Sequence, residues 1–178
     1  MKKRRKNRSR ILIVIGMLLI VLAGILYHNN LLEDRNAANA SEAILKDLHA
    51  GNASEAGVYG TLQISKLNLQ LPVLSEWSEE GLKQAPCKYT GSAETGDLII
   101  AAHNFDSHFG RLESLSYGDR IEFTDRYGDR YVYTVKEVEI LEDTEVSKLQ
   151  AGAWKLTLFT CTISTEARVT VRCEFENE

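Results

Sequence analysis

The sequence predicts a mostly β fold, a closed or nearly closed barrel with short helices, preceded by an N-terminal transmembrane helix. Three observations lead to this prediction: an uncharged apolar run beside a basic tail, a series of short strand-like segments after residue 58, and compact polar turns between them. The 178 residues, 44% of them hydrophobic, suffice for one domain of ordinary size. With 12 glycines, 2 prolines and 3 cysteines, the composition argues against collagen-like, disordered and disulfide-framework classes.

Charge is divided unevenly along the chain. Residues 1–10 contain seven of the 21 basic residues and no acid, so the rest of the chain carries 14 basic against 25 acidic side chains. An acidic body repels phosphate, which argues against nucleic acid as a partner. We therefore interpret residues 1–10 as a cytoplasmic basic tail beside a membrane.

Residues 11–28 are predicted to form the membrane anchor. The first 17 of them contain no charged or strongly polar side chain, which is about the lower limit for a helix that spans a hydrocarbon core of about 30 Å. Because positive charge stays on the cytoplasmic side, we expect a single-pass protein of the cell membrane with a cytoplasmic N-terminus and an extracellular C-terminal domain. A buried core helix would fit poorly beside seven cations.

A cleaved secretory signal is the alternative to a retained anchor. The triplet at residues 38–40, Ala-Asn-Ala, resembles a signal-peptidase site. The apolar run, however, is longer than the usual core of a signal, and the triplet lies well beyond its end. These two features favour the retained anchor.

Residues 29–57 are interpreted as an extracellular stalk and linker. The stalk is rich in Ala, Leu, Glu and Lys, which predicts a helix, with Ser41 as candidate N-cap of a segment that begins at Glu42. Small residues at 51–57 then interrupt this pattern, so the boundary of the folded domain is placed there. Residues 58–178 form the extracellular domain, with 12 basic and 20 acidic side chains.

Seven segments of the domain are predicted as strands from their alternation or their continuous apolar character. They are residues 60–64, 67–71, 97–102, 120–124, 131–138, 155–160 and 168–175. Compact polar turns at residues 117–119 and 127–129 separate two pairs of them. Helical pattern is confined to short pieces at residues 78–84 and 109–115. Because closure hides strand edges, we expect a barrel.

The three cysteines of the domain occur in different contexts. Cys173 alternates with polar residues along the last strand and is expected to be a small core side chain. Cys87 follows a proline in a presumed loop with no recognisable chemical context. Cys161 ends an apolar strand that leads into a polar turn, so its thiol is expected to be accessible. A neighbouring cation would make it a nucleophilic thiolate.

His103 and an arginine complete a candidate catalytic set. His103 follows the apolar strand that ends at residue 102, and it is the candidate acid or base, although a histidine there can also be an ordinary surface residue. An antiparallel return after Cys161 would bring Arg168 or Arg172 beside the thiol. His108 lacks companions at metal-ligand spacing. From the residues alone, a cysteine acyl-transfer enzyme is the hypothesis.

These segments resemble the sortase family. Residues 157–161, TLFTC, match the family's TLxTC motif, and the strand from Arg168 is similar to the one that opens with the family's essential arginine. His103 occupies the position of the catalytic histidine. Segments at residues 71–73 and 90–92 are also similar, so the resemblance covers most of the domain. It implies a sortase-type barrel of about eight strands.

One departure from the family pattern precedes His103. Ala102 stands where the family usually has Gly, and a position that required positive φ would be strained there. The resemblance implies substrate-binding positions at Ala102 and Thr160. Arg168 is favoured over Arg172 as the essential arginine, because it begins its strand nearest the loop that leaves Cys161.

The resemblance implies a membrane-anchored cysteine transpeptidase. Such an enzyme cleaves an LPxTG-like sorting signal carried by surface proteins and joins the new carboxyl end to a cell-wall precursor amine (lipid II) or a pilin lysine. Cys161 would form the thioacyl intermediate, Arg168 would stabilise the oxyanion and His103 would transfer protons. No cofactor or metal is required. Calcium binding by the acidic run Glu142, Asp143 and Glu145 is an alternative to an ordinary solvated loop.

The class within the family and two rival functions stay open. No aromatic-bearing segment or long helical extension is recognised before residue 58, which favours a class A or D type over a pilin-polymerising one. An exported cysteine hydrolase is one rival, although papain-like families usually place the cysteine before the histidine. A non-catalytic membrane-tethered binding module is the other, and it would not explain why TLxTC, His and Arg coincide.

Overall fold

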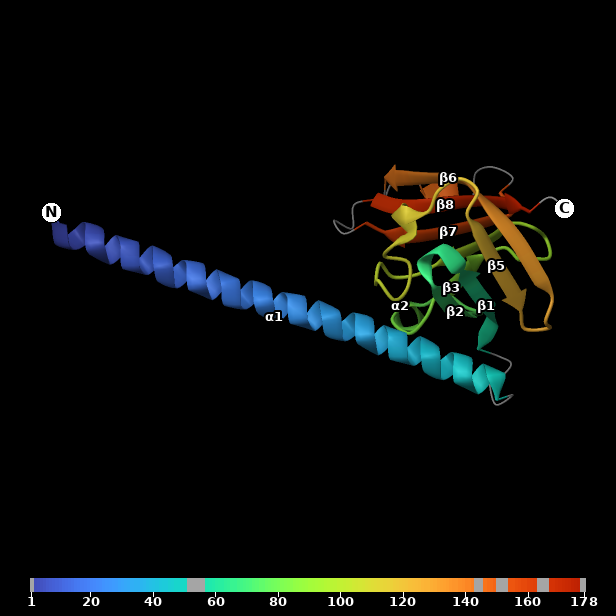
Figure 1. Cartoon of the computed structure of the whole chain (residues 1–178), viewed down its shortest axis with the longest axis horizontal. Coiled ribbons are helices and arrows are strands. Elements are labelled where there is room, and N and C mark those ends of the chain that lie inside the picture. Colours follow the sequence, from blue (N-terminus) through green and yellow to red (C-terminus); the bar gives the residue numbers. More distant parts are fainter. Residues whose placement is uncertain (1, 51–56, 143–145, 150–153, 163–166, 177–178) are drawn as a thin grey trace. The chain divides into compact units, whose positions relative to one another are not determined.

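The computed structural model of the chain describes residues 2–50, 57–142, 146–149, 154–162 and 167–176 (Figure 1). The chain divides into two compact units, Met1–Arg35 and Asn36–Glu178. The first unit is helical. The second contains the strands together with the C-terminal end of the N-terminal helix.

Helix α1, Lys2–His49, is continuous over 48 residues. Its apolar side chains within residues 11–27 are exposed around the whole circumference, with Leu18 at 63% and Tyr27 at 73%. By length and composition α1 can cross a membrane, although a signal sequence has the same character. The long apolar helix is therefore confirmed. A helix start at Ser41 is wrong, because α1 passes through this residue without a break.

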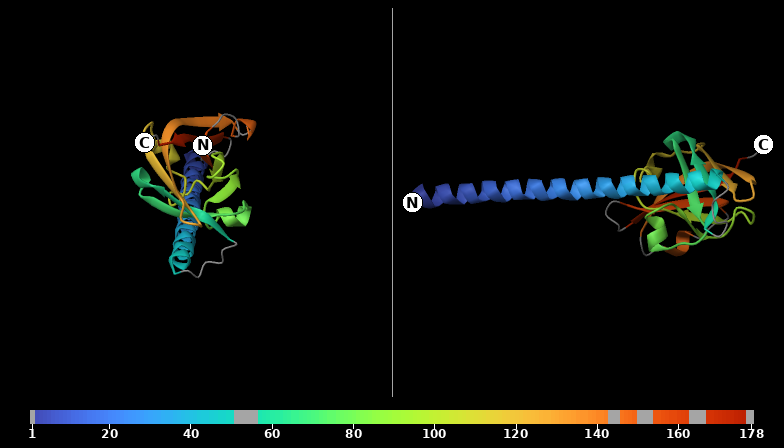
Figure 2. Two further views of the ribbon diagram at one scale, coloured as in Figure 1. Left: turned by 90° about the vertical axis from the view of Figure 1, so that its right-hand side faces the viewer. Right: turned by 90° about the horizontal axis from the view of Figure 1, so that it is seen from below.

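Eight strands form a closed barrel in the second unit: β1 Val58–Ile64, β2 Leu69–Leu74, β3 Cys87–Thr90, β4 Leu98–Ala101, β5 Arg120–Asp125, β6 Arg130–Glu142, β7 Leu156–Cys161 and β8 Ala167–Phe175. Their order is β1-β2-β3-β4-β7-β8-β6-β5, and β5 closes the barrel by pairing with β1 (Figure 1, Figure 2). Neighbours are antiparallel except for the parallel pairs β2–β3 and β4–β7. The predicted closed barrel of about eight strands is confirmed.

Four short helical pieces connect the strands: η1 Ser65–Leu67, α2 Glu79–Leu82, η2 Leu112–Ser114 and α3 Val146–Leu149. α2 begins after Ser78, whose Oγ accepts a hydrogen bond of 2.9 Å from the backbone N of Gly81 and so caps the helix. The helical pattern predicted around α2 and η2 is confirmed, in shorter form. α3 lies in a segment for which no helix was predicted.

Strand β3 lies in a segment for which no strand is predicted, and Cys87 is expected in a loop. That placement is wrong, because Cys87 is the buried first residue of β3. The strand has four residues and joins β2 through the single pair Leu74 and Cys87. Its register with β4 shifts between Lys88 and Thr90. A strand so short and irregular does not display a period of two in the sequence.

Inward-facing side chains of the strands fill the barrel. They include Leu62, Ile64, Leu98, Ile100, Phe123, Tyr133, Leu156, Leu158 and Val171, all fully buried. Cys173 lies in the same cluster, which confirms it as a core residue. Each fully buried aliphatic side chain contributes about 1.5–3 kcal/mol relative to an exposed one. The interior therefore forms a close-packed support for the strand ends.

The neighbouring strands β4 and β7 of the barrel are also covered on their outer face. Ile99 and Ala101 of β4 and Phe159 of β7 are buried there with Leu141 of β6 and Leu149 of α3. A strand covered on both faces needs apolar side chains at every position, which explains why β4 is a continuous apolar run.

Candidate active site

The candidate residues lie at the ends of three neighbouring strands. β4 and β7 run parallel with Ala101 beside Phe159, so both strands end on the same side of the barrel. β8 runs antiparallel to β7 and begins where β7 ends. His103 follows β4 by two residues, Cys161 is the last residue of β7, and Arg168 is the second residue of β8. The fold thus brings together segments that are far apart in sequence.

Side-chain alternation places Cys161 and Arg168 on the outer face of the barrel. Along β7, Leu158 faces the interior cluster and Phe159 the outer cluster, so Cys161 shares the outer face with Phe159. Arg168 pairs directly with Cys161 in the β7–β8 register. Side chains of directly opposed residues project on one face with Cβ atoms about 4.5–5.5 Å apart. The side chain of Arg168 therefore starts directly opposite that of Cys161 on this face.

The three cysteines differ in accessibility. All three are free, and Cys161 is exposed whereas Cys87 and Cys173 are buried. Burial raises the pKa of the Cys87 thiol and, more strongly, that of Cys173. These two thiols stay protonated in apolar surroundings and cannot act as nucleophiles. Cys161 is the thiol that a substrate can reach.

Arg172 occupies a different environment from Arg168. Its side chain is 3% exposed and lies opposite Thr157, two pleats away from Cys161. Nε donates to Oε1 of Glu139 at 2.8 Å, and Nη1 donates to the carbonyl of Leu149 at 2.8 Å and to Oγ1 of Thr157 at 3.1 Å. Nη2 donates to a further carbonyl of α3, that of Lys148, at 2.6 Å.

The contacts of Arg172 give it a structural role. They hold the C-terminal end of α3 against β7 and β8, and a guanidinium with this many partners is not available to a substrate. Arg168 is predicted to be the essential arginine in preference to Arg172. In the structure Arg168 pairs with Cys161 in the β7–β8 register, and Arg172 anchors α3.

The loop after β4 holds His103 in place. The His103 ring packs on Phe105 with centroids 5.0 Å apart, and Phe105 packs on His108 at 5.8 Å. The backbone N of Phe109 donates to the carbonyl of His103 at 3.2 Å, and the N of Gly110 donates to that of Phe105 at 2.8 Å. Gly110 is required here, because a Cβ at this position would lie 2.5 Å from the carbonyl O of the loop's Asn104.

Comparison with known proteins identifies this arrangement. The sequence profile described as the Sortase domain matches residues 62–176, which is more than half of the chain. The chain belongs to the sortase family. By family it is a sortase cysteine transpeptidase. Comparison with curated protein sequences gives no match.

Solved sortase structures share its fold. Sortase C1 from Streptococcus agalactiae is 25% identical with a TM-score of 0.61, and the match covers 68% of this chain and 69% of that one. Sortase A from Listeria monocytogenes is also 25% identical, with a TM-score of 0.61. The match covers 68% of this chain and 88% of that one. A sortase D5 from Clostridium perfringens is 18% identical, with a TM-score of 0.62. The match covers 80% of this chain and 99% of that one. These scores differ too little to separate the classes.

Two further sortase positions, Ala102 and Thr160, have buried side chains. Ala102 belongs to the interior cluster, and its backbone N donates to the carbonyl of Phe159 at 3.2 Å. Thr160 is 3% exposed, and its hydroxyl has no hydrogen-bond partner among the described residues. The alanine is not strained, since Asn68 is the one described residue other than glycine with positive φ. Both side chains thus face away from the outer surface that carries Cys161.

The metal hypotheses concern other parts of the chain. Asp143 and Glu145 of the acidic run lie outside the described residues, while Glu142 ends β6. Within the described ranges, no group of three or more His, Cys, Asp or Glu side chains could hold a metal ion. His108 is fully buried, and its Nε2 lies 3.1 Å from Oγ of Ser41. Nε2 of His108 is therefore occupied by its hydrogen bond with Ser41 of α1.

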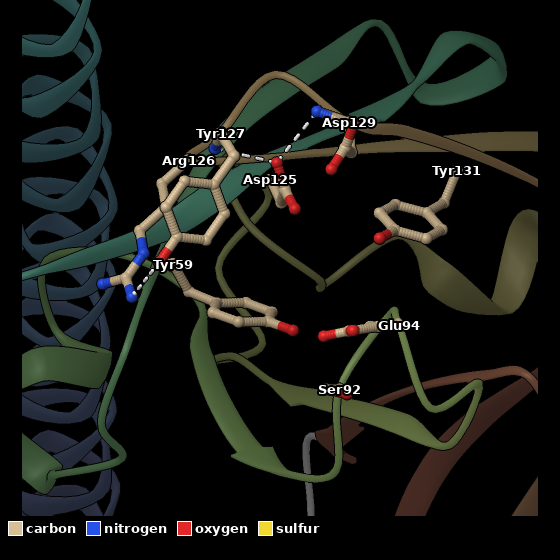
Figure 3. A pocket seen from close by; sticks show the side chains of 8 residues that line it. All are labelled: Tyr59, Ser92, Glu94, Asp125, Arg126, Tyr127, Asp129 and Tyr131. Carbon is tan, nitrogen blue, oxygen red and sulfur yellow. Dashed lines mark hydrogen bonds between the residues drawn. The ribbon is translucent and has the colours of Figure 1, made fainter.

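A polar depression of about 500 Å³ lies at the other end of the barrel (Figure 3). It is lined by Tyr59, Ser92, Glu94, Asp125, Arg126, Tyr127, Asp129 and Tyr131. The carboxylate of Asp125 accepts hydrogen bonds from the backbone N of Tyr127 and of Asp129, at 2.8 and 2.9 Å, and so closes the β5–β6 turn. Burial and the nearby carboxylates raise the pKa of Tyr131. Because the depression adjoins the start of β4 and β6, it is remote from Cys161.

Proposed function

We propose that this sortase cleaves LPxTG-like sorting signals of surface proteins and transfers them to an amine of the cell-wall precursor (lipid II) or of a pilin subunit. The observation that carries the proposal is the register of β7 and β8, which sets Arg168 opposite the exposed thiol of Cys161. His103 follows the adjacent strand end. These three side chains are the proposed catalytic residues.

Each step of the proposed reaction has a group to perform it. The Cys161 thiolate attacks the scissile Thr carbonyl, and the guanidinium of Arg168 stabilises the resulting oxyanion. His103 as imidazolium donates a proton to the departing amine, which leaves a thioacyl enzyme. The imidazole of His103 then accepts a proton from the incoming amine, whose nitrogen attacks the thioester. The new amide is released and the thiolate is restored.

The substrate class rests on the family and on one structural relative. A sortase C from Clostridium perfringens, 20% identical with a TM-score of 0.60, is solved with the C-terminal cell wall sorting motif. We extend this type of substrate to the present chain. Ala102 and Thr160 would contact the peptide through backbone groups, because their side chains are buried.

The proposed location follows from α1. A helix of this length and composition can anchor the enzyme in the cell membrane as a single span. With seven basic residues before the apolar run, the N-terminus is proposed to be cytoplasmic and the barrel extracellular. The barrel would then meet surface proteins during or after their export.

The preference for a class A or D enzyme over a pilin-polymerising one stays a prediction. One of its two grounds, the lack of a helical extension before the barrel, is wrong. Residues 36–49 are helical and belong to the compact unit that contains the barrel. The acceptor amine must therefore be found by experiment.

The proposal is tested by mass spectrometry of the full chain in detergent micelles, incubated with LPxTG-type peptides and then with a glycine amine. The expected result is a thioacyl adduct on Cys161 that is released to the amine. The adduct should vanish in Cys161→Ala and persist in the matched control Cys87→Ala, whose thiol is buried. A folded chain with a reactive Cys161 that forms no adduct with any peptide would refute the proposal.

A further inference from the structure

The C-terminal end of α1 contacts two loops of the second unit, the one that precedes β3 and the one that follows β4. Within the second unit, Ala37 is fully buried and Ser41 is 3% exposed, and the half-buried Ile44, Leu45 and Leu48 continue the same helical face. This spacing of three and four residues is the stripe of an amphipathic helix. The small side chains at positions 37 and 41 let the helix backbone approach closely. Residues 36–49 are therefore part of the folded domain, not a free stalk.

Ser41 makes two hydrogen bonds at this contact. Its Oγ donates to the carbonyl of Gln84 at 2.7 Å and lies 3.1 Å from Nε2 of His108. A carbonyl can only accept, so the hydroxyl proton points to Gln84. The hydroxyl oxygen must then accept from His108, which places a proton on Nε2 of that ring. Loss of either partner would leave a buried polar atom unsatisfied.

The contact continues from His108 to the proposed catalytic histidine. His108 packs on Phe105, and Phe105 packs on His103, with centroid separations of 5.8 and 5.0 Å. His103 lies beyond the last paired residue of β4. Its ring contacts Phe105, a residue of the loop that follows β4. A path of direct contacts leads from Ser41 through two rings to His103.

We infer that residues 36–49 of α1 set the position of His103, with Ser41 and His108 as positioning residues. This inference rests on the proposed function, in which His103 transfers protons. Proton transfer requires the ring within hydrogen-bond reach of both the leaving and the entering amine. A displaced ring slows the chemical steps while the peptide still binds. The juxtamembrane helix is thus a component of the active site.

The test compares variants of the full chain in detergent micelles. Ser41→Ala removes the hydroxyl, and Ala37→Leu adds bulk at the fully buried position and is expected to push the helix away from the loops that hold Gln84 and His108. For both we expect kcat for transpeptidation to fall about tenfold, with KM within about twofold of the parent value. Ser41→Thr keeps a hydroxyl and should restore most of kcat. Glu42→Ala is the matched control, since Glu42 is exposed and pairs with Lys46 on the same helix.

A second measurement does not depend on activity. NMR of the ring carbons of the chain's four histidines should show a changed His103 signal in Ser41→Ala and Ala37→Leu but not in Glu42→Ala. An active parent whose variants keep both kcat and the His103 signal would overturn the inference. An inactive parent whose His103 signal still shifts would refute the proposed function and leave the coupling of helix and histidine established.

Discussion

Cys161 and Arg168 are directly opposed residues on the antiparallel pair of strands β7 and β8, at the point where β7 ends and β8 begins. Both project from the outer face, where the thiol is exposed. In the proposed mechanism, this pairing sets the cationic side chain of Arg168 across from the nucleophile Cys161. The position of Arg168 therefore depends on the strand register. A shift of β8 by one residue would turn its side chain to the inner face of the barrel.

The first prediction concerns this arginine. Arg168→Ala should lower kcat/KM for transpeptidation by roughly 10²–10³-fold, because the oxyanion loses its charged donor. Arg168→Lys should recover only part of the activity, since an ammonium lacks the planar fork. Steady-state kinetics with a fluorogenic LPxTG-type peptide measures both. Activity equal to that of the parent in Arg168→Ala would show that the arginine has no catalytic role.

The second prediction assigns Arg172 to stability. Arg172→Met should lower the free energy of unfolding by about 3 kcal/mol, because the Glu139 carboxylate and two α3 carbonyls lose a buried partner. Arg120→Met is the matched control. Arg120 is about half exposed in its ion pairs with Glu122 and Glu176, so its loss should cost less than about 1 kcal/mol for each pair. Urea unfolding measures the free energy of unfolding of both variants. Equal decreases in the two variants would contradict the anchoring role of Arg172.

The third prediction uses thiol accessibility. At about pH 8, iodoacetamide should modify the folded chain once, at Cys161. Cys87 and Cys173 are buried and their pKa values are raised, so both should react only after denaturant is added. Peptide mapping of the alkylated protein locates the modification. Rapid labelling of Cys173 in the native chain would show that the barrel interior is open to reagents.

The fourth prediction concerns alkaline pH. Burial raises the pKa of Tyr133 above its ordinary value of 10.0, and its hydroxyl has no hydrogen-bond partner among the described residues. Below about pH 10 the phenol is protonated in both states and contributes no pH dependence. Above it the unfolded state loses the proton while the folded state keeps it, so the free energy of unfolding falls as pH rises.

Tyr133→Phe tests this titration. The variant should be as stable as the parent at about pH 8, because an unsatisfied buried hydroxyl is replaced by hydrogen. Between about pH 10 and 11.5 its stability should fall less steeply than that of the parent, by up to about 1.4 kcal/mol per pH unit. Urea titrations at several pH values compare the slopes. Parallel curves would exclude Tyr133 as the titrating group.

Several features could be predicted from short stretches of sequence. The charge and hydropathy of residues 1–28 indicate a long apolar helix, and alternation indicates most strands, including the one that buries Cys173. The TLxTC motif, His103 and the following arginine indicated the family that the domain profile then showed. These patterns repeat within a few residues, so neighbouring positions are enough to reveal them. β3 could not be predicted, because a strand of four residues with a register shift shows no alternating pattern of polar and apolar side chains.

Tertiary structure decided what each polar side chain does. Arg168 and Arg172 lie on the same face of one strand and look alike in sequence, but Arg172 is buried by its hydrogen bonds to α3, whereas Arg168 lies opposite the exposed Cys161. Ser41, expected to cap a helix, is instead bonded across 67 positions to His108 and across 43 to Gln84. Most helices and strands, and the exposed cysteine at the end of a strand, could be predicted from the sequence alone, because these features depend on local periodicity and chemistry. Only packing determined which groups meet, since contacts at such separations depend on how the barrel closes.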